Sequence, residues 1–203
     1  MTTYRIVEIF ESLQGEGYNT GLPAIFIRLG KCNLACAWCD TDYLRFQNMS
    51  LAQIVQRVQS YTARHIIITG GEPTIQPHLD KLLMTLKDLG YRLLIETNGL
   101  HPVLPQIDYI AVSPKACYAA KYEQQCISHA DEVRIVADGD VLAFCETMEQ
   151  KIQAQHYYLS PCEQQGVMNI YDTIRQIGCL NSREHAPVHW QLSIQTHKWA
   201  GIE

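Results

Sequence analysis

Short apolar runs alternate with amphipathic segments along most of this 203-residue chain, and this alternation constrains its fold more than any other feature. Runs rich in isoleucine, valine and aromatic residues predict strands, whereas leucines and valines recurring every three or four residues predict helices. Strands are expected at residues 4–10, 24–30, 65–69, 91–96, 109–113, 132–136, 156–159 and 188–194. Helices are expected from a cap at Ser50 to residue 61, from Pro77 to residue 89, and near residues 140–153 and 167–178.

Strands that alternate with helices predict a parallel sheet, because a parallel connection needs a crossover segment that is usually a helix. The chain is shorter than the roughly 250 residues typical of a closed eight-fold barrel. We therefore expect an α/β fold that is a partial, open (β/α) barrel or a doubly wound sheet. No linker composition interrupts the chain, so one domain is expected over residues 1–203. In either architecture ligands bind at the carboxyl ends of the strands.

Charge and composition argue against two classes of partner. The net charge is −5 and no Lys/Arg-rich run occurs, so a nucleic-acid partner held through its phosphates is not expected. The N-terminus lacks a secretory pattern, and no apolar run is long enough to span a membrane. With eight cysteines and no export signal, a cytoplasmic protein is expected, in which clustered cysteines indicate metal binding or catalysis.

Three of the cysteines lie in one short segment, KCNLACAWCDT at residues 31–41, directly after a predicted strand. The spacing of Cys32, Cys36 and Cys39 predicts a metal centre with an open position, because a closed structural zinc site needs four ligands. The alternative is a zinc site completed by His185 or His189. The other cysteines lack ligand spacing and are expected to be buried or incidental thiols: Cys117, Cys126, Cys145, Cys162 and Cys179.

Unusual segments follow several other predicted strands: TGGEPT at 69–74, ETNG at 96–99 and SPK at 113–115. Glycines 70 and 71 let the backbone approach a ligand closely. Ser113 and Lys115 offer a hydroxyl and an ammonium suited to a carboxylate. Each segment alone could be an ordinary turn, but their positions predict that all of them converge with the cysteine loop on one face.

The cysteine spacing, with GGEP after the next strand, resembles the radical S-adenosylmethionine (SAM) superfamily. This resemblance implies an open barrel of the radical SAM type and a [4Fe–4S] cluster held by Cys32, Cys36 and Cys39, with SAM on the remaining iron. One electron then cleaves SAM to a radical that abstracts hydrogen from the substrate. The cofactor contacts that it implies are Trp38, Cys39, Asp40, Gly71, Glu72, Ser113, Pro114 and Lys115.

The stretch FESLQGEG at 10–17, followed by Gly21, FIRLG at 26–30 and the cysteine loop, is similar to the 7-carboxy-7-deazaguanine synthase family; QTHK at 195–198 extends the similarity. The resemblance implies a lyase that contracts 6-carboxy-5,6,7,8-tetrahydropterin to 7-carboxy-7-deazaguanine with loss of ammonia, in queuosine and deazapurine biosynthesis. It further implies that SAM is regenerated in each turnover. No side chain is needed to abstract hydrogen, so no catalytic side chain is predicted.

The substrate contacts that this family implies are Leu13, Gln14, Gly15, Glu16, Arg28 and Thr69. Gln14 and Glu16 complement the donor and acceptor edge of a pterin, and Arg28 can bind its carboxylate with two N–H groups. Thr41 is expected to bind Mg²⁺, which prefers oxygen ligands. A homodimer and a reducing partner such as flavodoxin are also expected.

Two segments differ from the family pattern. Ser160 precedes Pro161 where many relatives have glutamine, and the chain ends in Glu203 where some relatives end in proline. We expect the tail to fold inward near His197 and Lys198. Two alternatives remain at this point: a radical activase that acts on a partner protein, and a non-enzymatic zinc or iron–sulfur module.

Overall fold

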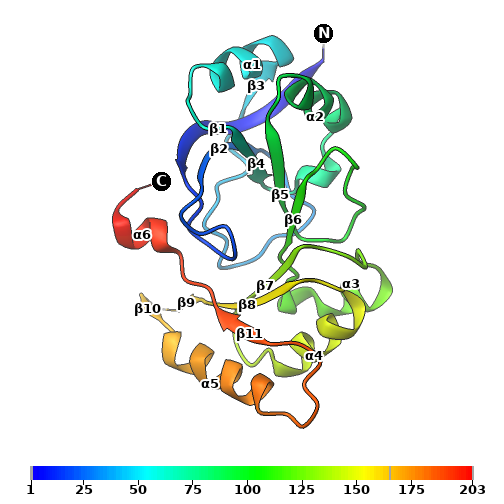
Figure 1. Cartoon of the computed structure of the whole chain (residues 1–203), viewed down its shortest axis with the longest axis vertical. Helices are drawn as coiled ribbons and strands as arrows, with labels where there is room; N and C mark the ends of the chain where they lie inside the picture. The colour runs from blue at the N-terminus through cyan, green and yellow to red at the C-terminus, as the bar shows by residue number, and fades with distance from the viewer. Residues whose placement is uncertain (1, 165, 203) are drawn as a thin grey trace.

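The computed structural model describes residues 2–164 and 166–202. Its main feature is a nine-stranded sheet in the order β11-β8-β7-β6-β5-β4-β2-β1-β3 (Figure 1). These strands are β1 (Thr3–Leu13), β2 (Pro23–Leu29), β3 (Gln47–Ser50), β4 (His65–Gly70), β5 (Arg92–Thr97), β6 (Tyr109–Val112), β7 (Glu132–Ala137), β8 (His156–Pro161) and β11 (Trp190–Leu192). The helices are α1 (Leu51–Gln59), α2 (Leu79–Asp88), α3 (Ala119–Gln124), α4 (Leu142–Lys151), α5 (Ile170–Asn181) and α6 (Thr196–Ala200).

The stretch of sheet from β2 through β4, β5, β6, β7 and β8 to β11 is entirely parallel. In the described chain β11 and β3 form the two edges and do not pair with each other, so the sheet stays open. The predicted partial, open barrel is therefore confirmed. The single domain expected over residues 1–203 stays a prediction, which this continuous sheet supports.

The first two strands differ from the expected parallel pattern. β1 pairs antiparallel with β2, and β3 pairs antiparallel with the other edge of β1. The reason is that residues 14–22 connect β1 to β2 without a crossover helix, and a short connection brings the chain back antiparallel. β3 was not predicted, because its sequence QNMS lacks the apolar alternation of a strand.

The helix boundaries differ from the predictions in a few places. Ser50 caps α1 as predicted and forms a capping box with Gln53. α2 begins at Leu79 rather than at Pro77, because His78 has a left-handed backbone with φ of 61° and cannot continue a helix. Residues 167–168 form β10, which pairs with β9 (Glu163–Gln164), so α5 starts later than expected. The short helices α3 and α6 were not predicted.

Side-chain alternation separates the two faces of the sheet. Ile25 and Ile27 of β2 pack into a core with α1 and α2, whereas Phe26, between them, packs on the inner face. A second core joins β7 and β8 to α4 and α5 (Figure 1). Of the described helices, none has the length and apolar character needed to cross a membrane.

Candidate active site

A cavity of about 560 Å³ opens at the carboxyl ends of the parallel strands. Its volume lies within the range of typical small-molecule sites. All of the predicted site residues line it except Pro114, which is buried between the lining residues Ser113 and Lys115. The four segments that follow strands therefore converge, as predicted. The role of each residue stays a prediction.

The inner-face residues of successive strands form the floor of this cavity. Arg28 on β2 is in register with Thr69 on β4, and Thr69 donates a hydrogen bond of 2.8 Å to Glu96 on β5. Further along the sheet, Arg134 on β7 and Ser160 on β8 line the same cavity. These residues share a face because every second side chain of a strand points to the same side.

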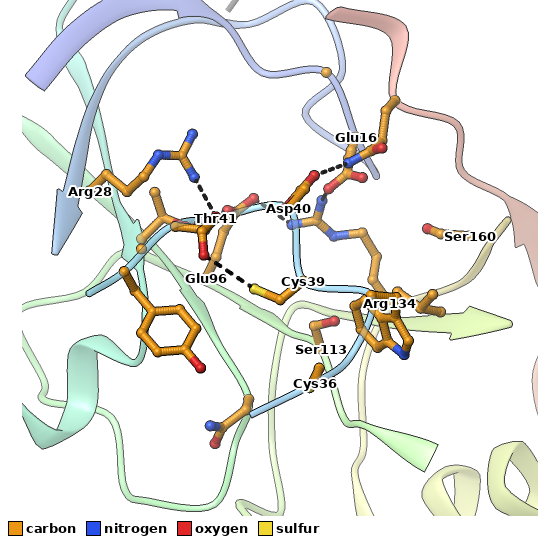
Figure 2. Close-up of a pocket in the computed structure, with 18 of the residues that line it drawn as sticks. Glu16, Arg28, Cys36, Cys39, Asp40, Thr41, Glu96, Ser113, Arg134 and Ser160 are labelled. Carbon is orange, nitrogen blue, oxygen red and sulfur yellow. Dashed lines mark hydrogen bonds and ion pairs between the residues drawn. The ribbon is translucent and has the colours of Figure 1, made fainter. Parts of the chain in front are cut away.

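Arg134 connects the loop after β1 to the sheet, and sequence reasoning missed it. Its side chain donates to Glu16 Oε2 at 2.6 Å and to Glu96 Oε1 at 2.7 Å (Figure 2). Gln14 Nε2 also donates to Glu96 Oε1, at 3.1 Å. A signal existed: Arg134 is the single charged residue inside the apolar run VRIV, as Arg28 is inside AIFIRL. An arginine buried in a strand needs acidic partners.

Arg28 contacts Thr41, a residue for which a different function is predicted. Its Nε forms an ion pair with Glu8 at 2.7 Å. Its Nη1 donates to the Thr41 hydroxyl at 3.2 Å (Figure 2). The guanidinium also lies 5.7 Å from the ring centre of Phe10. The predicted carboxylate-binding arginine and the predicted magnesium-binding threonine are thus in direct contact.

The cysteine loop presents free thiols to the cavity. Cys32, Cys36 and Cys39 all line it, and the Leu34 backbone N–H donates to Cys32 Sγ at 3.4 Å. Burial raises the pKa of Cys36 to about 12 and raises that of Cys32 above its usual value. Iron binding must therefore displace protons from these thiols. An N–H donor aimed at a sulfur is a feature of iron–sulfur sites, where it tunes the cluster potential.

The donor set fits a cluster better than a single ion. Among residues 2–164 and 166–202, no three His, Cys, Asp or Glu side chains converge on one metal-ion position. A zinc site needs such convergence, whereas the cysteines of a [4Fe–4S] cube bind three different iron atoms at separate corners. Three soft thiolates on one loop match the second case.

The predicted cofactor contacts form a small connected group. Lys115 Nζ lies 5.2 Å from the ring centre of Trp38 and donates to Ser113 Oγ at 2.7 Å. Trp38 Nε1 donates to Asp138 at 2.9 Å, which ties the cysteine loop to the end of β7. The loop is therefore held at a fixed distance from Ser113 and Lys115.

Glu72 lines the cavity, but its carboxylate is occupied by the protein. The residue is 1% exposed, and its carboxylate accepts hydrogen bonds from the Thr97 hydroxyl at 2.7 Å and the Asn98 N–H at 2.7 Å. It also accepts from the backbone and the hydroxyl of Thr74. These hydrogen bonds fix the turn after β4 and leave the backbone of Glu72 as the part best placed to contact a cofactor.

The C-terminal segment folds over the cavity. Lys198 Nζ forms an ion pair with Asp40 Oδ2 at 2.9 Å, and Gln195 donates to the same oxygen at 3.3 Å. Burial raises the pKa of Asp40, but the Lys198 contact outweighs it and lowers the pKa below the usual range. Thr196 donates twice to the Gly15 carbonyl. The predicted role of Glu203 lies outside the described residues.

Glu96 gives a testable dependence of stability on pH. Burial raises its pKa, but the attraction of Arg134 and the hydrogen bonds from Arg134, Thr69 and Gln14 outweigh it, so that the pKa falls to about 2. A depressed carboxyl pKa contributes stability that is present above the unfolded-state value and is lost as the pH falls toward 2. We expect this contribution to be about 3 kcal/mol.

The test compares the wild-type chain with Glu96→Gln by urea unfolding, without cluster, at several values of pH from 7 to 2. The free-energy difference between the two proteins should be largest at neutral pH and should shrink below pH 5. Curves that stay parallel down to pH 2 would show that Glu96 has an ordinary pKa in the folded chain.

Comparison with known protein families assigns this fold and site to a class of enzymes. A family model described as the Radical SAM superfamily matches residues 26–116, from β2 to the segment after β6. The open parallel barrel and the cysteine loop at its carboxyl edge thus define a radical SAM enzyme. This class uses a [4Fe–4S] cluster together with SAM.

Similar proteins narrow the class to one family. The chain is 78% identical to the 7-carboxy-7-deazaguanine synthase of Neisseria meningitidis serogroup B, over 98% of this chain and 94% of that protein. It is 58% identical to the Haemophilus influenzae protein of the same name, with the same coverage. The crystal structure of QueE from Escherichia coli matches with a TM-score of 0.70 at 30% identity, over 95% of this chain and 94% of that one. The chain belongs to the 7-carboxy-7-deazaguanine synthase family, which confirms the sequence prediction.

Proposed function

We propose that this chain converts 6-carboxy-5,6,7,8-tetrahydropterin to 7-carboxy-7-deazaguanine with loss of ammonia, a ring contraction that serves queuosine and deazapurine biosynthesis. The observation that carries the proposal is the single cavity in which the cysteine loop meets side chains suited to a carboxylated pterin. The name that the two similar proteins share supports the same product.

The substrate half of the cavity binds and orients the pterin. Gln14 and Glu16 supply amide and carboxylate groups for its donor and acceptor edge, and Thr69 supplies a hydroxyl at the cavity floor. Leu13 and Gly15 border the ring. Arg28 binds the substrate carboxylate, since a guanidinium forms two parallel hydrogen bonds with a carboxylate.

The cofactor half places SAM beside the cluster. Cys32, Cys36 and Cys39 hold the cluster, and Ser113 and Lys115 bind the SAM carboxylate. The remaining contacts come from Trp38, Asp40, Gly71, Pro114 and the backbone of Glu72. When bound, the cluster and SAM supply the one-electron chemistry that removes a hydrogen atom from the substrate. The chain supplies placement and exclusion of water, and no side chain abstracts hydrogen.

Magnesium completes the site through Thr41. The Thr41 hydroxyl accepts a hydrogen bond of 3.2 Å from Arg28, so a cation bound at Thr41 lies beside a guanidinium. Two neighbouring positive groups need an anion between them. The substrate carboxylate meets this need, and for that reason we infer that Mg²⁺ and the substrate bind together.

Four further features belong to the proposal. All eight cysteines are free in the described structure, which supports a reducing cytoplasmic location. The proposal includes an electron carrier such as flavodoxin, because the cluster needs an external electron. It also includes a homodimer. The substrate is a small molecule rather than a nucleic acid.

The experiment is an anaerobic assay of the reconstituted, reduced protein with SAM, Mg²⁺ and 6-carboxytetrahydropterin, followed by mass spectrometry. We expect 7-carboxy-7-deazaguanine to accumulate well beyond the amount of SAM consumed. Cleavage of SAM without this product would require a different substrate. An intact cluster with no SAM cleavage would contradict the proposal.

A further inference from the structure

Arg134 is a buried cation in the wall of the cavity. It is 5% exposed, and its guanidinium contacts three carboxylates: Glu16 at 2.6 Å, Glu96 at 2.7 Å and Glu132 at 2.7 Å. The three acids come from the loop after β1, from β5 and from β7 itself. A single cation therefore joins the cavity loop to two strands of the sheet, and Figure 2 shows its contacts with Glu16 and Glu96.

The carboxylates around Arg134 hold further parts of the same loop. Glu132 Oε2 accepts from the Tyr18 backbone N–H at 2.9 Å and from the Tyr109 hydroxyl at 2.8 Å. Glu96 Oε1 accepts from Gln14 Nε2, and the Gln14 amide oxygen in turn accepts from the Glu16 backbone N–H at 3.1 Å. Every polar side chain of the loop segment 14–16 is thus connected to Arg134 directly or through one intermediate.

The charge of this group matters for what it can bind. Three carboxyl groups surround one guanidinium, so the wall around Arg134 carries an excess of acidic groups and of hydrogen-bond acceptors. Within the described residues, Glu16 Oε1 has no hydrogen-bond partner, whereas Glu16 Oε2 is held by Arg134. A ligand edge that carries N–H donors, such as an aminopyrimidine, complements such a wall.

We propose that Arg134 is a positioning residue for substrate binding. It holds Gln14 and Glu16 in the orientation in which they bind the donor edge of the pterin. This inference rests on the proposed function, which assigns these two residues to the substrate. Arg134 acts through its carboxylate partners, so its loss should weaken substrate binding and leave SAM binding nearly unchanged.

A purely structural role for Arg134 can be separated from positioning by a matched control. Arg183 also contacts two carboxylates, Glu149 at 2.6 Å and Glu146 at 3.3 Å, but it lies beyond the end of α5 and does not line the cavity. Replacing Arg183 removes a partly buried arginine and its ion pairs without touching the site. The backbone of the cavity loop keeps other anchors, because Ser193 accepts from the Gly17 N–H at 2.9 Å.

The test measures dissociation constants for 6-carboxytetrahydropterin and for SAM, anaerobically, on the cluster-loaded protein. The variants are Arg134→Gln, Arg134→Lys, Arg183→Gln and Glu16→Gln, each with its Tm. For Arg134→Gln we expect the pterin Kd to rise by roughly 30-fold or more, with the SAM Kd within about twofold of wild type. Arg134→Lys keeps the charge but loses the planar fork, and should give an intermediate pterin Kd.

The outcomes separate this inference from the proposed function. If Glu16→Gln weakens pterin binding while both Arg134 variants bind it as tightly as Arg183→Gln does, the positioning role is wrong and the site assignment stands. If Glu16→Gln binds the pterin normally, the substrate assignment itself fails. Equal losses of pterin and SAM affinity in Arg134→Lys would mean that the cavity has collapsed and would also overturn the positioning role. If Arg134→Gln does not fold, Arg134→Lys decides by the same criteria.

Discussion

Alanine in place of any one of Cys32, Cys36 or Cys39 is expected to abolish turnover while the chain still folds. The three thiols are free and line the cavity, and Cys32 and Cys36 only border the second core, so alanine leaves the buried residues of that core in place. A cube held at three corners has no protein ligand to spare, since the fourth iron must stay open for SAM. Losing one thiolate therefore removes the cluster and every step that depends on it.

The measurement is the iron and sulfide content, with the brown charge-transfer absorption, after anaerobic reconstitution of Cys36→Ala, followed by the product assay. The matched control is Cys126→Ala, because both side chains are partly buried and Cys126 does not line the cavity. The control should load a full cluster and turn over normally. A complete cluster and normal turnover in Cys36→Ala would remove this cysteine from the ligand set.

Gly71→Ala is expected to damage both stability and cluster loading. A Cβ at this position would overlap the Lys31 carbonyl group and lie 3.1 Å from the Cys32 nitrogen. The Lys31 backbone cannot move freely, because its carbonyl accepts from the Glu72 N–H at 2.9 Å and its N–H donates to Tyr43 at 2.8 Å. Lys31 already has a left-handed φ of 72°, which a lysine adopts only at a cost. The clash must therefore displace the start of the cysteine loop.

Overpacking of this kind costs about 1–3 kcal/mol, and each kcal/mol lowers the Tm of a chain this size by about 2–4 °C. We expect Gly71→Ala to show this loss in thermal unfolding and to bind less iron than wild type at equal protein concentration. The control is Gly139→Ala, where an added Cβ meets no atom within 4 Å. Equal Tm and iron content in the two variants would mean that the turn tolerates a side chain.

The strand and helix pattern was predictable because it depends on local alternation. The strands at 65–69 and 91–96 and the capped helix at Ser50 were found within a residue or two. The α2 start was misplaced because the left-handed backbone of His78 leaves no mark in the hydrophobic pattern. The strand β3 was missed because it is held by pairing with β1 rather than by its own composition.

The candidate site was predictable for those residues that belong to a contiguous sequence motif. The cysteine spacing, SLQGEG and GGEP stand in contiguous sequence, and their positions after strands predicted that they meet. The actual partners were not predictable. The predicted cofactor contact of Glu72 stays a prediction, but the hydrogen bonds of its carboxylate with Thr97 and Asn98, at the end of the next strand, leave no mark in the sequence.

By itself, the sequence determined the family, the open parallel barrel and the loop that can hold a cluster, since each of these depends on residues close together in the chain. Only the tertiary structure decided which charges meet. Arg134 is 118 residues from Glu16, and Lys198 is 158 residues from Asp40. Such pairs form because strand register and the returning C-terminal segment bring distant side chains to one wall, and no local pattern encodes that distance.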